Sequence, residues 1–218
     1  MANAHDLLMA QRAAMMGGKA LPYDAEVEYL ESHGTEYIDT GIIATQNTIV
    51  KSDCTLLMMN DAYSAMWGAR KGSRDNDFQV YYNNGNVGGN PSSIVLRTGN
   101  NQKLINGSDF GISSGGLLGV RLEISCGSGW IKVNDHQFTT PEFQFTSPHS
   151  LCLFCEYTLG AARNFGSFRY YGWSASGDVN ADFIPVRVGT VGYMYDRVSG
   201  QLFRNAGTGA FVIGPDKT

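Results

Sequence analysis

The sequence predicts an all-β protein, a sandwich of two antiparallel sheets preceded by one short α-helix, and three observations support this. Apolar and polar residues alternate with a period of two in several short segments, the pattern of strands with one buried face. Dipeptides that favour tight turns separate these segments, and the 27 glycines add further turn positions. After residue 25 no segment has the longer period of an amphipathic helix.

The composition excludes several classes of protein. The 218 residues include 16 Lys and Arg against 20 Asp and Glu, a formal net charge of −4. This balance argues against a nucleic-acid partner, because binding of that kind relies on basic side chains that neutralise phosphates. No apolar run approaches the ~20 residues that cross a bilayer, so we expect no membrane insertion. Apolar residues make up 43% of the chain, which is enough for a sizeable core.

The first 18 residues favour a short helix. Asn3 is a suitable N-cap, Asp6 lies in the first turn, and Gly17 and Gly18 end the segment. A basic leading region is missing and Asp6 interrupts the apolar stretch, so we do not expect a secretory signal peptide. We divide the chain into a helix and linker over residues 1–24 and a sandwich domain over residues 25–218.

So short a helix is marginally stable alone and must dock on something. Its apolar side chains cover much of its circumference, which favours docking on another chain over packing on its own domain. We expect the docking contacts to come from Leu7, Leu8, Met9, Arg12, Met15 and Met16. The expected partners are another protein or sister copies in a symmetric, preferably trimeric, homo-oligomer.

Four segments carry the clearest alternation. The residues predicted to face the core are Val27 and Tyr29; Phe78, Val80 and Tyr82; Val120, Leu122, Ile124 and Cys126; and Ile184, Val186 and Val188. Trp67 and Trp173 also occupy core positions in this pattern. Turn dipeptides such as Asn84-Gly85 and Ser199-Gly200 lie between the strands.

The four cysteines are expected to be buried, reduced side chains. Cys152 and Cys155 form a CxxC, but they lie in an apolar run over residues 151–155 that predicts one buried strand. Residues three apart on a strand point to opposite faces, so an uninterrupted strand would keep these thiols from sharing a metal ion. Cys54 and Cys126 complete no second pair at zinc-site spacing.

Two longer segments resemble a known family. VEYLESHGTEYIDTG over 27–41 is similar to the opening motif YLESxGTQYIDTG of concanavalin A-like, laminin-G-like jelly rolls, and DFIPVR over 182–187 matches a later motif. The segment VGYMYDRVSGQLFRNAGTGAF over 191–211 resembles the family's GxYDxVSGxFYxNAGTGxF. Between them, WGAR over 67–70 falls where the family has FGAR. The similarity spans about residues 28–215 and implies a jelly-roll sandwich.

This family occurs in structural proteins of gut bacteriophages and prophages and in surface proteins of gut bacteria. The resemblance therefore implies a non-enzymatic virion protein, made in the host cytoplasm, that is a head-fibre, decoration or tail-fibre component. Its helix would dock on capsid or tail proteins, and its jelly roll would face outward, onto host or mucus glycans. The alternative is a secreted or surface carbohydrate-binding module of a gut bacterium. Neither of these two functions implies a cofactor.

Candidate catalytic groups are scarce in the sequence. Glycosidases need two carboxylates around one bond, but Glu26 and Glu28 lie at a solvated first strand, while Glu36 and Asp39 should point to opposite faces. The glycine-rich NAGTG over 205–209 precedes a strand and has no Lys, unlike a phosphate loop. Asp75-Asn76-Asp77 is the one oxygen-rich cluster, and it lacks the further ligands of a calcium loop. We therefore expect no enzyme and no metal site.

A glycan site is the more plausible hypothesis. Sugar sites combine an aromatic face for stacking with amide, carboxylate and guanidinium groups for the hydroxyls. The stretch from residue 70 to residue 90 has this mixture, and Tyr81 should face outward because it alternates with core residues. The candidate carbohydrate-binding residues are Arg70, Asp75, Asp77, Tyr81, Asn83 and Asn84. An ordinary polar sheet surface with a hairpin is the competing interpretation.

Overall fold

The computed structural model describes residues 21–72, 76–84, 88–112 and 116–218. The helix predicted over residues 1–18 lies outside these ranges, and so does Asp75. All six predicted docking residues lie outside them too: Leu7, Leu8, Met9, Arg12, Met15 and Met16. None of the helices formed by the described residues is long and apolar enough to span a membrane.

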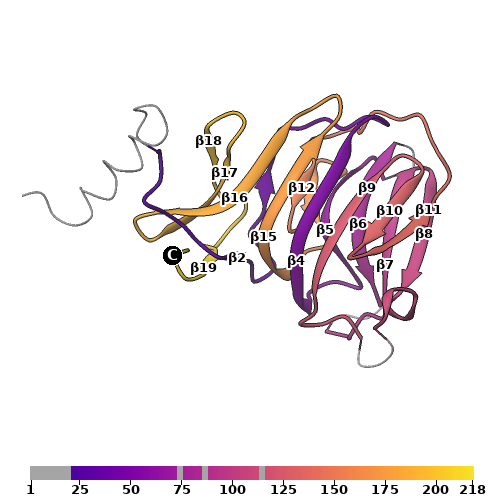
Figure 1. The fold of residues 1–218 in the computed structure, drawn as a ribbon, viewed down its shortest axis with the longest axis horizontal. Coiled ribbons are helices and arrows are strands. Elements are labelled where there is room, and N and C mark those ends of the chain that lie inside the picture. The colour runs from indigo at the N-terminus through magenta and orange to yellow at the C-terminus, as the bar shows by residue number, and fades with distance from the viewer. Residues whose placement is uncertain (1–20, 73–75, 85–87, 113–115) are drawn as a thin grey trace, which may run out of the picture.

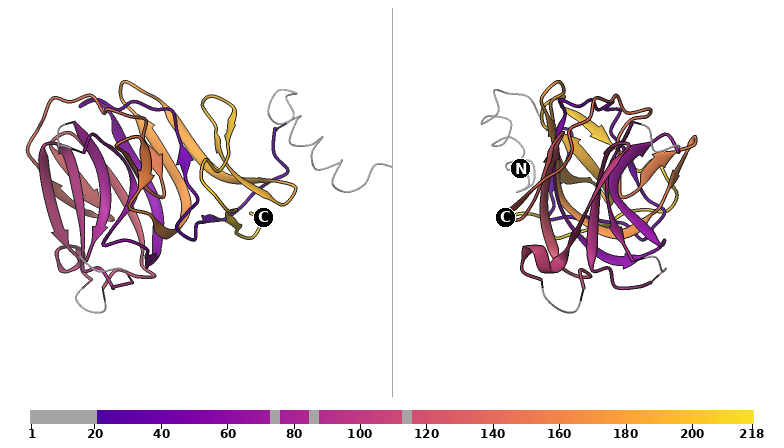
Figure 2. Two further views of the ribbon diagram at one scale, coloured as in Figure 1. Left: turned by 180° about the vertical axis from the view of Figure 1, so that it is seen from behind. Right: turned by 90° about the vertical axis from the view of Figure 1, so that its right-hand side faces the viewer.

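Two β-sheets face each other across one core (Figures 1 and 2). The larger sheet has the strand order β11-β10-β9-β4-β15-β16-β17-β18, with β1, β2 and β19 paired beside this path. Its strands are β1 (Ala25–Glu26), β2 (Leu30–Glu31), β4 (Ile49–Met59), β9 (Arg121–Gly127), β10 (Trp130–Val133), β11 (His136–Thr139), β15 (Gly166–Ser176), β16 (Ala181–Val188), β17 (Val191–Asp196), β18 (Gln201–Phe203) and β19 (Val212–Ile213).

The smaller sheet has the order β14-β13-β5-β6-β7-β8, with β3 and β12 added beside β5. Its strands are β3 (Ile38–Asp39), β5 (Tyr63–Arg70), β6 (Asp77–Asn83), β7 (Ser93–Gly99), β8 (Asn101–Asn106), β12 (Cys152–Leu153), β13 (Glu156–Thr158) and β14 (Ala161–Arg163). Between the described strands the pairing is antiparallel except for β13 and β5, which run parallel. One 3₁₀ turn, η1 (Gly107–Phe110), follows β8. The prediction of a sandwich of two antiparallel sheets is confirmed.

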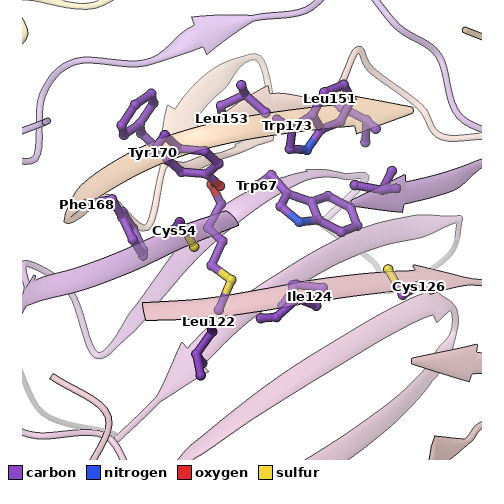
Figure 3. Packing of buried hydrophobic residues seen from close by; sticks show 14 of the residues in the cluster. Cys54, Trp67, Leu122, Ile124, Cys126, Leu151, Leu153, Phe168, Tyr170 and Trp173 are labelled. Atoms are coloured by element: carbon purple, nitrogen blue, oxygen red, sulfur yellow. The ribbon is translucent and has the colours of Figure 1, made fainter. Parts of the chain in front are cut away.

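The core lies between the two sheets (Figure 3). Trp67 of β5 is fully buried and Trp173 of β15 nearly so, as the alternation predicts. The inward side chains of β6 are Phe78, Val80 and Tyr82, again as predicted. Aromatic side chains therefore fill much of the space between the sheets, where each contributes a large apolar area.

The outer face of β16 differs from the prediction of one buried face. Phe183 lies in the main core, whereas Ile184 and Val186 lie in a second apolar cluster on the opposite face. This second cluster is closed by Tyr23, which is 4% exposed and packs edge-on to Tyr195 at 4.9 Å between ring centroids. Both faces of β16 are thus covered, because the chain before β1 crosses the outer face.

The CxxC segment also differs from the predicted strand. Strand β12 ends at Leu153, and Phe154 adopts the left-handed region with φ 71°. Its ring packs against Tyr170 at 4.6 Å and Phe211 at 4.8 Å, so burial of this ring offsets the unfavourable backbone conformation. The break brings the Cys152 and Cys155 thiols near each other, contrary to the expectation of opposite faces, so that Cys152 adds to the effect of burial in raising the pKa of Cys155.

The two motifs that carry the family resemblance meet in a single joint. The Glu36 carboxylate accepts hydrogen bonds from the backbone N–H groups of His33 and Thr35, at 2.8 Å and 3.3 Å. Asn205 in the glycine-rich turn accepts from the Tyr37 N–H at 3.1 Å, and the Ala206 N–H donates to the Tyr37 carbonyl. The glycine-rich turn is therefore hydrogen-bonded to the opening segment and is not arranged as a phosphate loop.

Gly207 explains why this turn needs glycine. A Cβ atom there would lie 2.0 Å from the carbonyl oxygen of Thr35, closer than any side chain tolerates. The first and last segments of the sandwich approach each other backbone to backbone at this point.

A second turn in the closing motif is organised by Asp196. Its carboxylate accepts from the N–H groups of Asp182, Val198 and Ser199 at 2.8, 3.1 and 3.1 Å, and Gly200 has φ 73°. This is the hairpin turn that the sequence predicts. Burial raises the pKa of this carboxyl, but the accepted hydrogen bonds outweigh burial and hold the pKa below its usual value.

We expect Asp196→Asn to lower the free energy of unfolding by about 1–3 kcal/mol at neutral pH, because an amide cannot accept all three hydrogen bonds. The carboxylate contributes stability above its unfolded pKa of about 3.9, and this contribution is lost as pH falls through the lower folded pKa. Urea unfolding at several pH values should therefore show the difference between the two proteins shrinking in acid. A difference that is constant with pH would contradict this account.

All four cysteines are buried and free, as predicted. Burial raises the pKa of the Cys54, Cys126 and Cys155 thiols, and the thiolate is the reactive form.

We expect denatured protein to titrate four thiols without reductant, and native protein to react with the same reagent far more slowly. Rapid labelling of the native protein would show that these residues are accessible.

Candidate functional site

The strongest candidate site is a pocket of about 130 Å³ on the outer face of the smaller sheet. Residues that alternate with the core residues of β5, β6 and β7 form it, together with residues of β13 and the turn after β14. Seven described residues line it: Tyr63, Arg70, Gln79, Tyr81, Arg97, Glu156 and Asn164. We call it the Arg70 pocket.

Arg70 holds two buried carboxylates at the base of this site. Its Nε lies 3.4 Å from Asp77 Oδ2, and its Nη1 lies 3.4 Å from Glu156 Oε1. The Asp77 side chain is fully buried and that of Glu156 nearly so. Asp77 also accepts from the Lys71 N–H at 3.2 Å. One guanidinium thus pairs with two acids, each of which would be very costly to bury without a partner.

Glu156 is the carboxylate that reaches the pocket. Asn164 donates to its Oε1 at 2.8 Å, and the left-handed backbone of Asn164 (φ 53°) positions this amide. Burial raises the pKa of Glu156, and the neighbouring Arg70 only partly counteracts this effect. The group is therefore a weaker acid than an exposed glutamate.

Two tyrosines form an aromatic wall. Tyr81 faces away from the main core, as predicted, but it is only 5% exposed because Arg97 covers it, with the guanidinium carbon 5.2 Å from the ring centroid. Tyr63 packs edge-on against Tyr81 at 5.8 Å and is itself 47% exposed. Tyr63 therefore presents the accessible ring of this site.

The structure brings some of the predicted site residues together and separates others. Arg70 and Tyr81 line the pocket, and Asp77 lies behind Arg70, away from the opening. Asn83 and Asn84 lie at the other end of β6, where Asn83 pairs with Tyr63 across the strands and Asn84 donates to Ala62. Neither asparagine lines the pocket.

Sequence reasoning missed five lining residues, namely Tyr63, Gln79, Arg97, Glu156 and Asn164. Alternation along β6 could have found Gln79, because it lies on the same face as Asp77 and Tyr81. Its cross-strand partner Arg97 requires the pairing of β6 with β7, and Glu156 requires the parallel pairing of β13 with β5. Such long-range pairings carry no local sequence signal.

A larger groove of about 440 Å³ lies on the outer face of the larger sheet, over β4, β9, β15 and β16. Two of the carboxylates that line it are paired: Asp53 binds Arg121 through two hydrogen bonds of 2.7 Å and 2.6 Å, and Asp182 binds Arg197 at 2.9 Å and 2.6 Å. Arg121 also covers the Tyr171 ring at 3.7 Å. These contacts occupy Asp53 and Asp182.

The Arg70 pocket offers groups for hydrogen bonding and ring packing, namely two guanidinium groups, two amides, one carboxylate and two tyrosines. Glycoside hydrolysis needs two carboxyl groups flanking the substrate, and of the described residues only Glu156 brings one to the pocket. The Glu36 carboxylate, named above as a possible acid, already accepts hydrogen bonds from the His33 and Thr35 N–H groups. Asp39 accepts from Gly41 and Ser150. Within the described ranges no three His, Cys, Asp or Glu side chains are grouped as metal ligands.

No protein-family model matches this chain, and no curated protein is similar to it.

We expect Glu156→Gln to leave the protein at least as stable as wild type at pH 7. A neutral amide avoids the burial cost of the carboxylate, and Arg70 still forms its ion pair with Asp77. Wild type loses stability as pH rises from the unfolded pKa of about 4.3 through the raised folded pKa, and the variant does not. Urea unfolding should show the free energy of unfolding of the variant rising relative to that of wild type across this pH interval. Lys51→Met, on β4 of the larger sheet, is the control, because it changes no group that titrates in this interval. A relative loss with rising pH would mean that Arg70 outweighs burial.

Proposed function

We propose that this chain is a non-enzymatic structural protein of a bacteriophage virion, a head-fibre, decoration or tail-fibre component. Its sandwich would be a jelly roll of the concanavalin A-like, laminin-G-like type. The observation that carries this proposal is the joint between the opening and closing motifs. The two segments with the most specific resemblance are held together where Asn205 accepts from the Tyr37 N–H and the Thr35 hydroxyl donates to the Thr208 carbonyl. Motifs that interlock in this way support a shared architecture better than two separate matches.

The non-enzymatic part of the proposal rests on the Arg70 pocket. One carboxylate at its surface and a second fixed behind Arg70 suit a binding site, because neither catalytic pairing for glycosides nor a nucleophile with its base is assembled there. We infer that the pocket binds glycans of the host or of mucus, since it combines an exposed tyrosine with amide, guanidinium and carboxylate groups.

The attachment part of the proposal rests on the sequence before the sandwich. The apolar residues between Leu7 and Met16 would dock on capsid or tail proteins, or on sister copies in a trimer. Residues 21–24 support this arrangement, because they are fixed on the sandwich: Asp24 accepts from the Gly189 N–H at 2.7 Å, and its own N–H donates to the Arg187 carbonyl. The segment that precedes them would thus leave the domain at a defined place.

We expect the full chain to band with the capsid proteins when phage particles from a culture that encodes it are purified on a density gradient. Deleting residues 1–20 should abolish incorporation while leaving the melting profile unchanged, since Tyr23 and the rest of the second cluster remain. Leu8→Asp is the sharper variant, because one charge in an apolar interface should weaken docking. Mass spectrometry of the particles gives the measurement.

Two outcomes would contradict the proposal. Particles that retain the truncated chain at the full level would refute attachment through the N-terminal segment. A full chain found only free of particles, secreted or on the surface of a gut bacterium, would favour the carbohydrate-binding module named above as the alternative.

A further inference from the structure

Three buried polar atoms of residues that line the Arg70 pocket have no hydrogen-bond partner among the described residues. One is Nε of Arg70, which faces Asp77 in the ion pair described above. The other two are Oε1 of Gln79, whose residue is 1% exposed, and Nε of Arg97. Gln79 and Arg97 are direct partners across β6 and β7, so both side chains emerge on the same face of the sheet. Buried polar groups almost always find a partner in a protein, a water or a ligand. Gln79 and Arg97 both line the pocket, and because these two atoms have almost no exposed surface, a ligand there would reach them only once the side chains that cover them move aside.

The two atoms are complementary. The Gln79 oxygen is an acceptor and the Arg97 Nε–H is a donor, and the two residues are neighbours across the strands. A pair of adjacent hydroxyl groups on a sugar ring satisfies both at once, because one hydroxyl donates while the next accepts. A single carboxylate or phosphate oxygen has no proton to donate to Gln79.

The charges of the pocket favour a neutral ligand. Arg70 is opposed by Asp77 and Glu156, and Arg97 supplies the second positive charge, so the four formal charges cancel. An anionic sugar would find no surplus of positive charge here. The volume of about 130 Å³ admits the edge of one ring, and the exposed Tyr63 ring offers a face against which the C–H groups of that ring can pack.

We propose that the Arg70 pocket binds one neutral pyranose ring through two adjacent hydroxyls, held by Gln79 and Arg97 and packed on Tyr63. This inference rests on the proposed glycan-binding function and narrows it to a neutral sugar residue with free vicinal hydroxyls.

The test uses the full chain with neutral methyl glycosides of glucose, galactose and mannose, and with glucuronic and N-acetylneuraminic acid glycosides as anionic probes. Amide chemical shifts in NMR titrations give both the affinity and the location of binding. We expect a neutral glycoside to shift the amides of Gln79 and Arg97. Removing one of its two adjacent hydroxyls should weaken binding by about tenfold.

Matched variants separate this pocket from the rest of the surface. Gln79→Met keeps the length of the side chain without the acceptor, and Arg97→Lys keeps the positive charge without Nε–H. Each should weaken binding by about tenfold. Tyr63→Ala removes the ring on which the sugar would pack and should also weaken binding. Lys51→Met, in the groove of the larger sheet, should have no effect.

Tighter binding of the anionic probes, or shifts that vanish only in Lys51→Met, would overturn the inference. Failure of every probe to bind would overturn it too, and the glycan-binding proposal with it. The virion proposal is judged separately by incorporation into particles, so its failure is distinguishable from the failure of this inference.

Discussion

The sandwich depends on a contact between its first and last segments. The Glu36 carboxylate orders the turn at residues 33–35, and the Asn205 side chain binds the Tyr37 backbone directly after it. Both groups give partners to backbone N–H donors of the opening segment, as a folded chain requires. Phe211, just beyond this turn, then reaches the core beside Phe154. The two sides of this contact are separated by most of the chain, 168 residues between Tyr37 and Asn205.

The smaller sheet has its own constraint in Arg70. Two acids are buried on one face of this sheet, and the fold tolerates them because a single guanidinium lies between them. The same arrangement leaves Glu156 facing a pocket and Asp77 hidden behind it. A polar cluster that is costly to bury therefore determines both the local stability of β5, β6 and β13 and the shape of the candidate site.

The sequence predicted the features that depend on local pattern. The alternation in β6 placed Phe78, Val80 and Tyr82 inward and Tyr81 outward, and the closing motif placed the Asp196 turn. It did not predict that Phe154 breaks the CxxC strand, because the left-handed residue is held by rings from distant elements. It missed the double-sided burial of β16 for the same reason, since Tyr23 covers that strand from the chain before β1. Of the candidate site, Arg70, Asp77 and Tyr81 came from composition and alternation, and the rest came from strand pairings that only the fold reveals.

Both ends of the described domain lie beside β16. Val27 bridges to Asp216, and Arg187 of β16 binds Asp216 through two hydrogen bonds while its backbone contacts Asp24. In two views the C-terminus lies at one end of the sandwich and β7 and β8 at the other (Figures 1 and 2). Ends placed so close together can be joined by a short linker, and the chain can then be reopened at the exposed turn of Ser199 and Gly200. The fold is thus a suitable scaffold for circular permutation, in which the order of the strands along the chain changes while their places in the two sheets do not.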